Sequence, residues 1–344
     1  MNNMKKIGLS ALAGSLVAFS ANAVEVSVSG KTEVTYSGVE GTNGNKWGGG
    51  NAITFSGSGD VNGMTATYTA VIGDSGQASS NTSETFASSS LMLDMGDMGT
   101  IGFDQGVGEF GVSTIDDKTP YAYEEIWTYT GASNGLAAAG GCNVIGYKNT
   151  FAGVSVSLEI DPGHSSSTTD QGGCTGDGGN TGGETTVSGY NYAVTAAVPY
   201  VEGLTVGFGH GKEEDTAYIA SQALRTDVTF TTGYASYAAG PVTVALQKSS
   251  KNGGSAGATS NNIDIMGVSF NVNDNFAISY NSMDNETDKT GGGTNVTEET
   301  TGIGASYTMG SASVRLLNAE TDNKAGNTSN ASVEHTEISL LLAF

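Results

Sequence analysis

The side chains with the clearest chemical potential are five carboxylates that lie close together in the sequence, between residues 106 and 141. This segment contains one basic residue, Lys118, and its acidic residues are Glu109, Asp116, Asp117, Glu124 and Glu125. Grouped carboxylates attract cations, and the attraction weakens as salt screens it. On an exposed loop the same residues would only be solvated. The elements that carry the segment therefore decide what its carboxylates do.

The sequence offers no comparable set for catalysis, a cofactor or a metal. Residues 106–111 spell G-x-G-x-x-G, but no helix follows them, so a dinucleotide-binding turn lacks its structural context. The histidines His164, His210 and His335 are too widely separated to suggest a zinc site or a catalytic triad. We therefore expect neither an enzyme nor a cofactor-binding protein.

The composition excludes further classes of protein. The chain has 344 residues, 52 of them Gly, and its 35 acidic and 13 basic residues give a formal net charge of −22. Such an excess of acid cannot build a phosphate-binding surface, so nucleic acid is not an expected partner. Charged residues make up 14% of the chain, against about 25% in typical soluble domains. This difference argues against an ordinary cytosolic enzyme.

The apolar residues recur with a period of two, which is the period of a β-strand. Near the start of the chain, for example, Val26 and Val28 alternate with Ser27 and Ser29. Sixteen such runs are present. They predict strands over residues 24–39, 51–60, 64–73, 85–94, 99–105, 143–149, 153–161, 187–198, 203–211, 225–238, 241–249, 262–271, 275–283, 298–308, 311–319 and 333–344.

Short and long connections alternate along these strands. Seven tight, turn-rich links, such as residues 60–63 and 95–98, alternate with eight long polar links. Turns at one end and loops at the other are what an even-numbered, antiparallel, up-and-down closed sheet requires. We therefore predict an all-β fold, a single 16-stranded antiparallel β-barrel.

A barrel of sixteen strands encloses a lumen too wide for side chains to fill. Its polar face must then line water, and its apolar face must contact lipid. Closure leaves no unpaired sheet edge, so the backbone polar groups are satisfied within hydrocarbon. Strands of about ten residues also match a tilted crossing of the bilayer. A soluble two-sheet sandwich is the less favoured alternative, since it normally has shorter links.

The first 23 residues have the pattern of a secretory signal peptide. Lys5 and Lys6 form a basic region, residues 7–19 are apolar or small, and Ala21 and Ala23 provide the small-x-small cleavage pattern. The apolar stretch is shorter than the about 20 residues that a membrane-spanning helix needs. We expect cleavage after Ala23, export, and one barrel domain over residues 24–344.

Several segments resemble Gram-negative general diffusion porins. They are VEVSVSGK at 24–31, SGSGDVNGMTATYTAVIG at 56–73, LMLDMGDMGTIGFDQG at 91–106 and the terminal Phe344. The resemblance implies a sixteen-stranded homotrimer in the cell outer membrane, whose third external loop folds into the barrel and narrows the pore. It also implies that the barrel-assembly machinery recognises the C-terminal strand through Phe344.

The third long link, residues 106–141, is also the longest, and loops of this length are usually functional. Length and resemblance together favour an inward-folded constriction lined by the five carboxylates, with an exposed acidic surface loop as the alternative. Its aromatic residues either dock it against the barrel wall or only pack within the loop. They are Tyr121, Tyr123, Trp127 and Tyr129.

Strand parity places a second set of charges on the lumen wall. These residues are Lys31, Glu33, Arg225, Arg315 and Glu337. The first and last strands become neighbours when the barrel closes, so Lys31, Glu33, Arg315 and Glu337 are expected to form one patch near mid-height. Arg225 is expected nearer the outer mouth. Arg225 and Arg315 are the only arginines, so the pore should be dominated by acid.

Cys142 and Cys174 are the only cysteines, and both lie at or near long external links. Export to an oxidising compartment favours a disulfide between them, which would tie the third loop to the fourth. Two free thiols are the alternative.

The predicted function is passive diffusion of small hydrophilic solutes and ions through a water-filled, cation-preferring channel. The alternative is a surface adhesin or receptor barrel that acts through its acidic loops, binds a ligand and conducts no ions.

Overall fold

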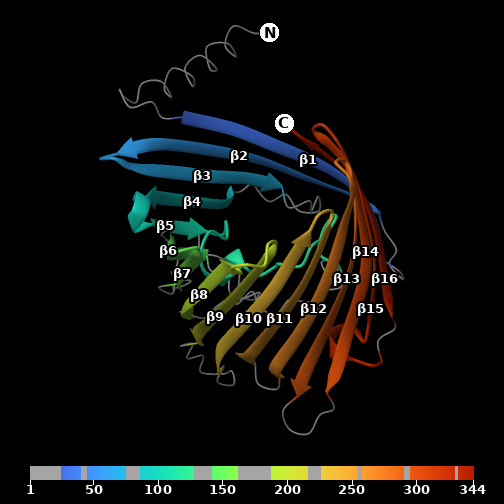
Figure 1. Cartoon of the computed structure of the whole chain (residues 1–344). Helices are drawn as coiled ribbons and strands as arrows, with labels where there is room; N and C mark the ends of the chain where they lie inside the picture. Colours follow the sequence, from blue (N-terminus) through green and yellow to red (C-terminus); the bar gives the residue numbers. More distant parts are fainter. Residues whose placement is uncertain are drawn as a thin grey trace.

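The computed structural model describes residues 25–39, 45–74, 86–127, 142–161, 187–215, 226–254, 258–289, 295–329 and 332–344. Its sixteen strands form one closed barrel, in which each strand pairs antiparallel with its sequence neighbours and the last strand returns to the first (Figure 1). The predicted 16-stranded antiparallel barrel is therefore confirmed. The strands are β1 (Glu25–Val39), β2 (Trp47–Val61), β3 (Met64–Asp74), β4 (Phe86–Asp94), β5 (Thr100–Gln105), β6 (Cys142–Phe151), β7 (Val154–Asp161), β8 (Val187–Ala197), β9 (Leu204–Asp215), β10 (Thr226–Ala239), β11 (Val242–Gly254), β12 (Ala258–Asn273), β13 (Phe276–Lys289), β14 (Val296–Met309), β15 (Ala312–Asp322) and β16 (Val333–Ala343).

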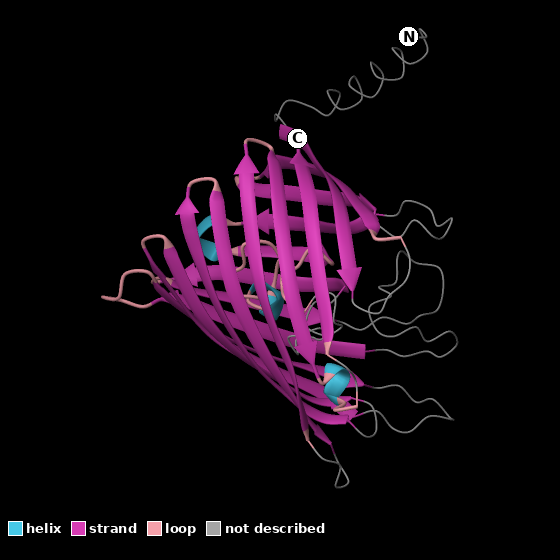
Figure 2. Cartoon of the chain, turned by 90° about the vertical axis from the view of Figure 1, so that its right-hand side faces the viewer, coloured by secondary structure: helices cyan, strands magenta, loops and turns pink. Residues whose placement is uncertain are grey.

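In the described residues, helical structure is limited to three short 3₁₀ turns, η1 (Gly96–Met98), η2 (Gly111–Thr114) and η3 (Lys324–Gly326), drawn in cyan in Figure 2. Within the described ranges, no helix has the length and apolar character needed to cross a membrane.

The two faces of the wall differ in polarity as the period of two predicts. On β16, for example, Ile338 and Leu340 are 46% and 43% exposed, whereas the intervening Ser339 is 1% exposed. Alternate side chains of a strand lie on opposite faces of the sheet. The apolar set therefore covers the outside of the barrel, and the polar set lies on the inside.

Tight turns join the strands at one end of the barrel. The β2–β3 turn has Asn62 at φ 55° and Gly63 at φ 81°, and the β6–β7 turn has Ala152 at φ 50° and Gly153 at φ 83°. Two successive residues with positive φ are typical of a type I′ hairpin, whose twist matches that of the flanking strands.

The external ends of several strands are longer than the predicted ones. Strands β11 and β12 extend to Gly254 and from Ala258, so three residues separate them in place of the long polar link that we expected. The added segments lack apolar alternation, and side-chain hydrogen bonds join β12 to β13 there. The Asn261 amide donates to Asn285 Oδ1 at 3.0 Å, and Ser260 Oγ donates to Asp288 Oδ2 at 2.9 Å.

The barrel closes at a contact between Gly30 and the C-terminal residue. The backbone of Gly30 and that of Phe344 exchange two hydrogen bonds, of 2.7 and 2.9 Å. The Phe344 ring occupies the space in which a side chain at position 30 would lie. A glycine in an otherwise alternating strand therefore provides the room for the terminal aromatic ring.

Candidate functional site

The described part of the third long link, residues 106–127, contacts polar side chains on the inward face of the barrel. Four of its backbone N–H groups donate to side-chain oxygens of β7, β8, β11 and β13. These pairs are Gly111 with Ser157 (2.8 Å), Val112 with Asn191 (2.7 Å), Lys118 with Gln247 (2.8 Å) and Ala122 with Ser279 (2.9 Å). The wall therefore supplies acceptors to a loop backbone that has no sheet partner of its own.

The beginning of this segment is held by a carboxylate and by an aromatic anchor. The Asp104 side chain accepts hydrogen bonds from the backbone N–H groups of Val107 (2.8 Å) and Glu109 (2.6 Å). The next residue, Phe110, is fully buried. Its ring lies against Gly102 of β5 and Gly146 of β6, which are paired in register, in the space that side chains would otherwise fill.

Two apolar clusters attach the rest of the segment to the wall. Val112 and Ile115 pack with Ala193 of β8 and Phe230 of β10. Further along, Ile126 and Trp127 pack in a larger cluster whose wall members are Ile263, Ile265, Met283, Leu317 and Ala319, with Tyr121 and Tyr123 against it. The aromatic residues Tyr121, Tyr123 and Trp127 therefore dock the segment on the wall. Tyr129 lies outside the described residues.

The five predicted loop carboxylates fall into two groups. Glu109 forms an ion pair with Lys148 of β6, with Nζ and Oε2 2.7 Å apart and both side chains more than one-third exposed. Asp116, Asp117, Glu124 and Glu125 lie further along the loop and are all partly buried. The charge of Glu109 therefore lies at a different position on the wall from the four carboxylates of residues 116–125.

Burial changes the acidity of the second group. Burial raises the pKa of Asp116, and the nearby positive charge of Lys118 opposes this effect. Burial also raises the pKa of Asp117 to about 8, and a hydrogen bond to Glu125 together with the charge of Glu125 adds to the increase. The raised pKa of Asp117 favours the protonated form of this carboxyl at neutral pH.

Three of the predicted wall residues meet at the seam of the barrel, around a loop tyrosine. Arg315 of β15 forms an ion pair with Glu33 of β1, and its guanidinium lies over the Tyr123 ring at 4.4 Å from the centroid. The Tyr123 hydroxyl donates to Glu337 of β16 and lies 3.1 Å from Glu33 Oε1. Burial and the bond to Glu337 raise the pKa of Tyr123, so its hydroxyl stays protonated.

The other predicted wall and loop residues are placed differently. Lys31 lies opposite Ala343, at the end of β16, whereas Glu337 lies opposite Ser37. No ion pair or hydrogen bond joins Lys31 to the patch in the part of the chain described here. The expectation that Lys31 belongs to this patch therefore stays a prediction; Lys31 lies on β1, two residues before Glu33. Arg225, Cys174 and the side chain of Cys142 lie outside the described residues.

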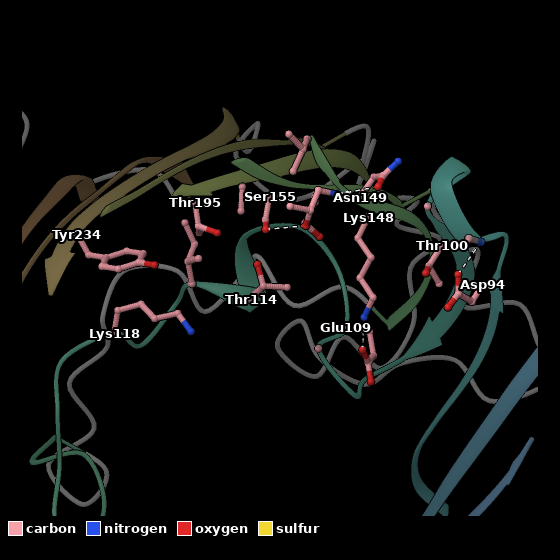
Figure 3. Close-up of a pocket in the computed structure, with 18 residues that line it drawn as sticks. Asp94, Thr100, Glu109, Thr114, Lys118, Lys148, Asn149, Ser155, Thr195 and Tyr234 are labelled. Atoms are coloured by element: carbon pink, nitrogen blue, oxygen red, sulfur yellow. Dashed lines mark hydrogen bonds and ion pairs between the residues drawn. The ribbon is translucent and has the colours of Figure 1, made fainter. Parts of the chain in front are cut away.

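The loop and the wall enclose a polar cavity of about 550 Å³ (Figure 3). It is lined on the loop side by Glu109, Thr114 and Lys118, and on the wall side by residues of β4 to β8 and β10 that include Lys148 and Tyr234. In the described ranges, no group of three or more His, Cys, Asp or Glu side chains is placed to hold a metal ion.

The wall residues Gln247 and Asn281 hold the loop and are not among those that the sequence predicts. Gln247 donates to the backbone carbonyls of Ile115 (3.1 Å) and Asp116 (2.9 Å), and Asn281 donates to that of Pro120 (3.1 Å). Each is an amide side chain at an inward position of a strand. Such side chains can both donate and accept, which is the signal that would have marked them as loop-docking groups.

Comparison with known proteins identifies the family of this barrel. Residues 8–333 match the family model described as Gram-negative porin. The chain belongs to the Gram-negative porin family. With the closed barrel, this makes the protein an outer-membrane porin channel. No curated protein matches the chain.

Solved porin structures share the fold at low sequence identity. The trimer form of in-vitro folded OmpT from Vibrio cholerae is 12% identical with a TM-score of 0.68, and the match covers 94% of this chain and 100% of OmpT. OmpF of Salmonella typhi in complex with daunomycin is 12% identical with a TM-score of 0.67 and the same coverages. The DcaP channel of Acinetobacter baumannii is 10% identical with a TM-score of 0.65, covering 94% of this chain and 98% of DcaP.

Proposed function

We propose that this porin is a passive, water-filled channel for small hydrophilic solutes and ions, that it prefers cations, and that it catalyses no reaction. The observation that carries the proposal is the set of hydrogen bonds from the segment 111–122 to inward side chains of four strands. A loop held in this way narrows the lumen, so solutes are selected by size at the loop.

The proposed cation preference depends on the charges that line this constriction. Glu109, Asp116, Asp117, Glu124 and Glu125 are on the loop, and Glu33 and Glu337 are on the facing wall. Lys148 neutralises Glu109 and Arg315 neutralises Glu33. The remaining carboxylates outnumber Lys118, the one basic residue of the loop, so an excess of negative charge remains even with Asp117 protonated. Carboxylates that line a pore favour cations.

The test is the reversal potential in a planar bilayer under a potassium chloride gradient. We compare the unmodified protein with a variant carrying Asp116→Asn, Asp117→Asn, Glu124→Gln and Glu125→Gln. The unmodified channel should be cation-selective, and the variant should lose most of that selectivity. Dilute salt is required, because screening over about 10 Å at 0.1 M already weakens the effect.

A control variant removes the same number of carboxylates from the outer face of the barrel. It carries Asp264→Asn, Asp284→Asn, Glu299→Gln and Asp322→Asn, which are neighbours across β12 to β15 and are exposed. Its reversal potential should equal that of the unmodified protein. If the loop variant keeps full selectivity, the constriction lies elsewhere. Specific ligand binding without any conductance would instead favour the adhesin or receptor alternative.

We also propose that the protein assembles as a homotrimer, as the trimer form of OmpT does, which a native mass measurement tests.

We propose that residues 1–23 are cleaved, and a mature N-terminus at Val24 would support this cleavage. We infer a disulfide between Cys142 and Cys174, and two alkylatable thiols in the unreduced protein would exclude it.

We propose that the barrel-assembly machinery recognises Phe344. This recognition predicts slower assembly when Phe344 is deleted.

A further inference from the structure

The cavity between the loop and the wall is large enough for a small solute. Its volume of about 550 Å³ lies within the range of about 300 to 1,000 Å³ that is usual for ligand pockets. Thr114 and Lys118 lie on its loop side, and Thr195 and Tyr234 project toward it from β8 and β10 (Figure 3). A solute that passes the loop on this side therefore meets a formed, polar surface.

Hydroxyl groups line much of this surface. Those of Thr100, Thr195 and Tyr234 make no hydrogen bond to other described residues, so they are available to a solute. Thr114 Oγ1 donates to the Gly111 carbonyl at 2.7 Å and keeps its acceptor capacity. A hydroxyl group both donates and accepts. This lining is therefore complementary to a solute that itself carries several hydroxyl groups.

The charges of the cavity are distributed unequally. On one side, the Lys148 ammonium is paired with Glu109. On the other side, the backbone of Lys118 is fixed by Gln247 at 2.8 Å, and the Lys118 ammonium forms no ion pair with any residue that the structure describes. The nearby, partly buried Asp116 offsets part of its charge. Lys118 is therefore the cation that an incoming anionic group meets.

We propose that this cavity binds a small polyhydroxylated carboxylate, a sugar acid of hexuronate size, with its carboxylate at Lys118 and its hydroxyl groups against Thr195, Tyr234 and Thr114. A monoanion fits better than a phosphate ester, because one cation is available and Asp94 and Glu109 line the opposite side. This inference rests on the proposed channel function, since the solute reaches the cavity through the lumen.

The test compares glucuronate with its methyl ester, which keeps the ring hydroxyls and loses the charge. Single-channel current in potassium chloride is recorded while either solute is added to one side. Glucuronate should reduce the current at roughly tenfold lower concentration than the ester, since a hydrogen-bonded, partly buried charge pair contributes about this factor. Lys118→Gln should abolish the difference, and Lys118→Arg should retain it. Thr195→Val should weaken both solutes.

Lys248→Gln is the matched control, because Lys248 is 73% exposed on the outer face and pairs with Asp264. It removes the same charge and should leave the difference between the two solutes unchanged. Equal effects of glucuronate and its ester on the unmodified channel would overturn the inference, and so would a persistent difference in Lys118→Gln. If a variant does not fold, the comparison of glucuronate with its methyl ester on the unmodified channel still tests the inference. Absence of channels altogether would refute the proposed function, whereas channels that treat both solutes alike would refute only this inference.

Discussion

The contact of Phe110 with two wall glycines allows us to predict how strongly the loop is docked on the wall. The ring is fully buried against Gly102 and Gly146. The three atoms nearest to a methyl group built at Gly146 all belong to this ring and would overlap it. Carbon atoms in contact stand about 3.5 to 4.0 Å apart. Gly146→Ala must therefore displace Phe110 from its site.

The free-energy cost of displacing Phe110 follows from the burial of its ring. Removing a buried Phe side chain from a protein core costs about 3 to 5 kcal/mol, and the part due to transfer from water is about 1.5 to 3 kcal/mol. The latter range applies here, since the loop can open without unfolding the barrel. Local opening should then become about 10- to 100-fold more frequent. The amides of Gly111 and Val112 report this opening directly, because both donate to wall side chains.

The assay is amide hydrogen exchange of residues 110–115 in the folded barrel, combined with single-channel conductance. Phe110→Ala and Gly146→Ala should each accelerate exchange and increase conductance, while the exchange of β1 and β16 stays unchanged. The double variant should resemble Phe110→Ala alone, because the added methyl group then has no ring to displace. Gly50→Ala is the control, since a methyl group at Gly50 meets nothing within 4 Å. Additive effects of the two substitutions, or an equal effect of Gly50→Ala, would refute this account of loop anchoring.

Three further predictions concern the loop carboxylates and the barrel seam. The pKa of Asp117 is raised to about 8 from an ordinary value of 3.8, so Asp117 gains its negative charge between pH 7 and 9. Cation selectivity, measured by the reversal potential, should therefore increase over this range. In Asp117→Asn it should stay constant. Because the folded loop binds more protons than the unfolded chain between these two values, loop docking should also weaken as pH rises from about 4 to 8, measurable by the same exchange experiment. Gly30→Val should displace the Phe344 ring from the seam and lower the yield of folded barrel, as judged by electrophoretic mobility without heating. Gly50→Val should have a smaller effect, and equal yields for the two variants would contradict the role of Gly30.

The architecture could be predicted because short-range patterns in the sequence specify the strands and the turns. A period of two identified all sixteen strands, and the tight turns were visible as residues such as Asn62 and Gly63, which tolerate positive φ. The errors lie at the external strand ends, such as 250–254 and 258–261. There no hydrocarbon demands an apolar face, and cross-strand hydrogen bonds between polar side chains maintain the ladder. Patterns of hydrophobicity contain no information about such pairing.

The site was less predictable because it depends on contacts between distant parts of the chain. Parity groups Glu33, Arg315 and Glu337, and closure makes β15, β16 and β1 neighbours, where Arg315 pairs with Glu33 and Tyr123 bonds to Glu337. Parity alone does not specify height, so the place of Lys31 in this patch stays a prediction. The Tyr123 hydroxyl that joins the patch comes from the loop, and its contact with Glu337 spans a separation of 214 residues.

The glycine pair shows most clearly what a single sequence leaves undetermined. Gly102 and Gly146 each stand at an inward position of a strand, and either one alone suggests only a weakened strand. Their meaning arises from the β5–β6 register, which places them opposite each other and creates a flat surface on the wall. Phe110 is then the side chain that covers this surface, because the turn held by Asp104 begins the loop at that height. The docking of Phe110 on the wall therefore results from three features that are unremarkable separately and act only together.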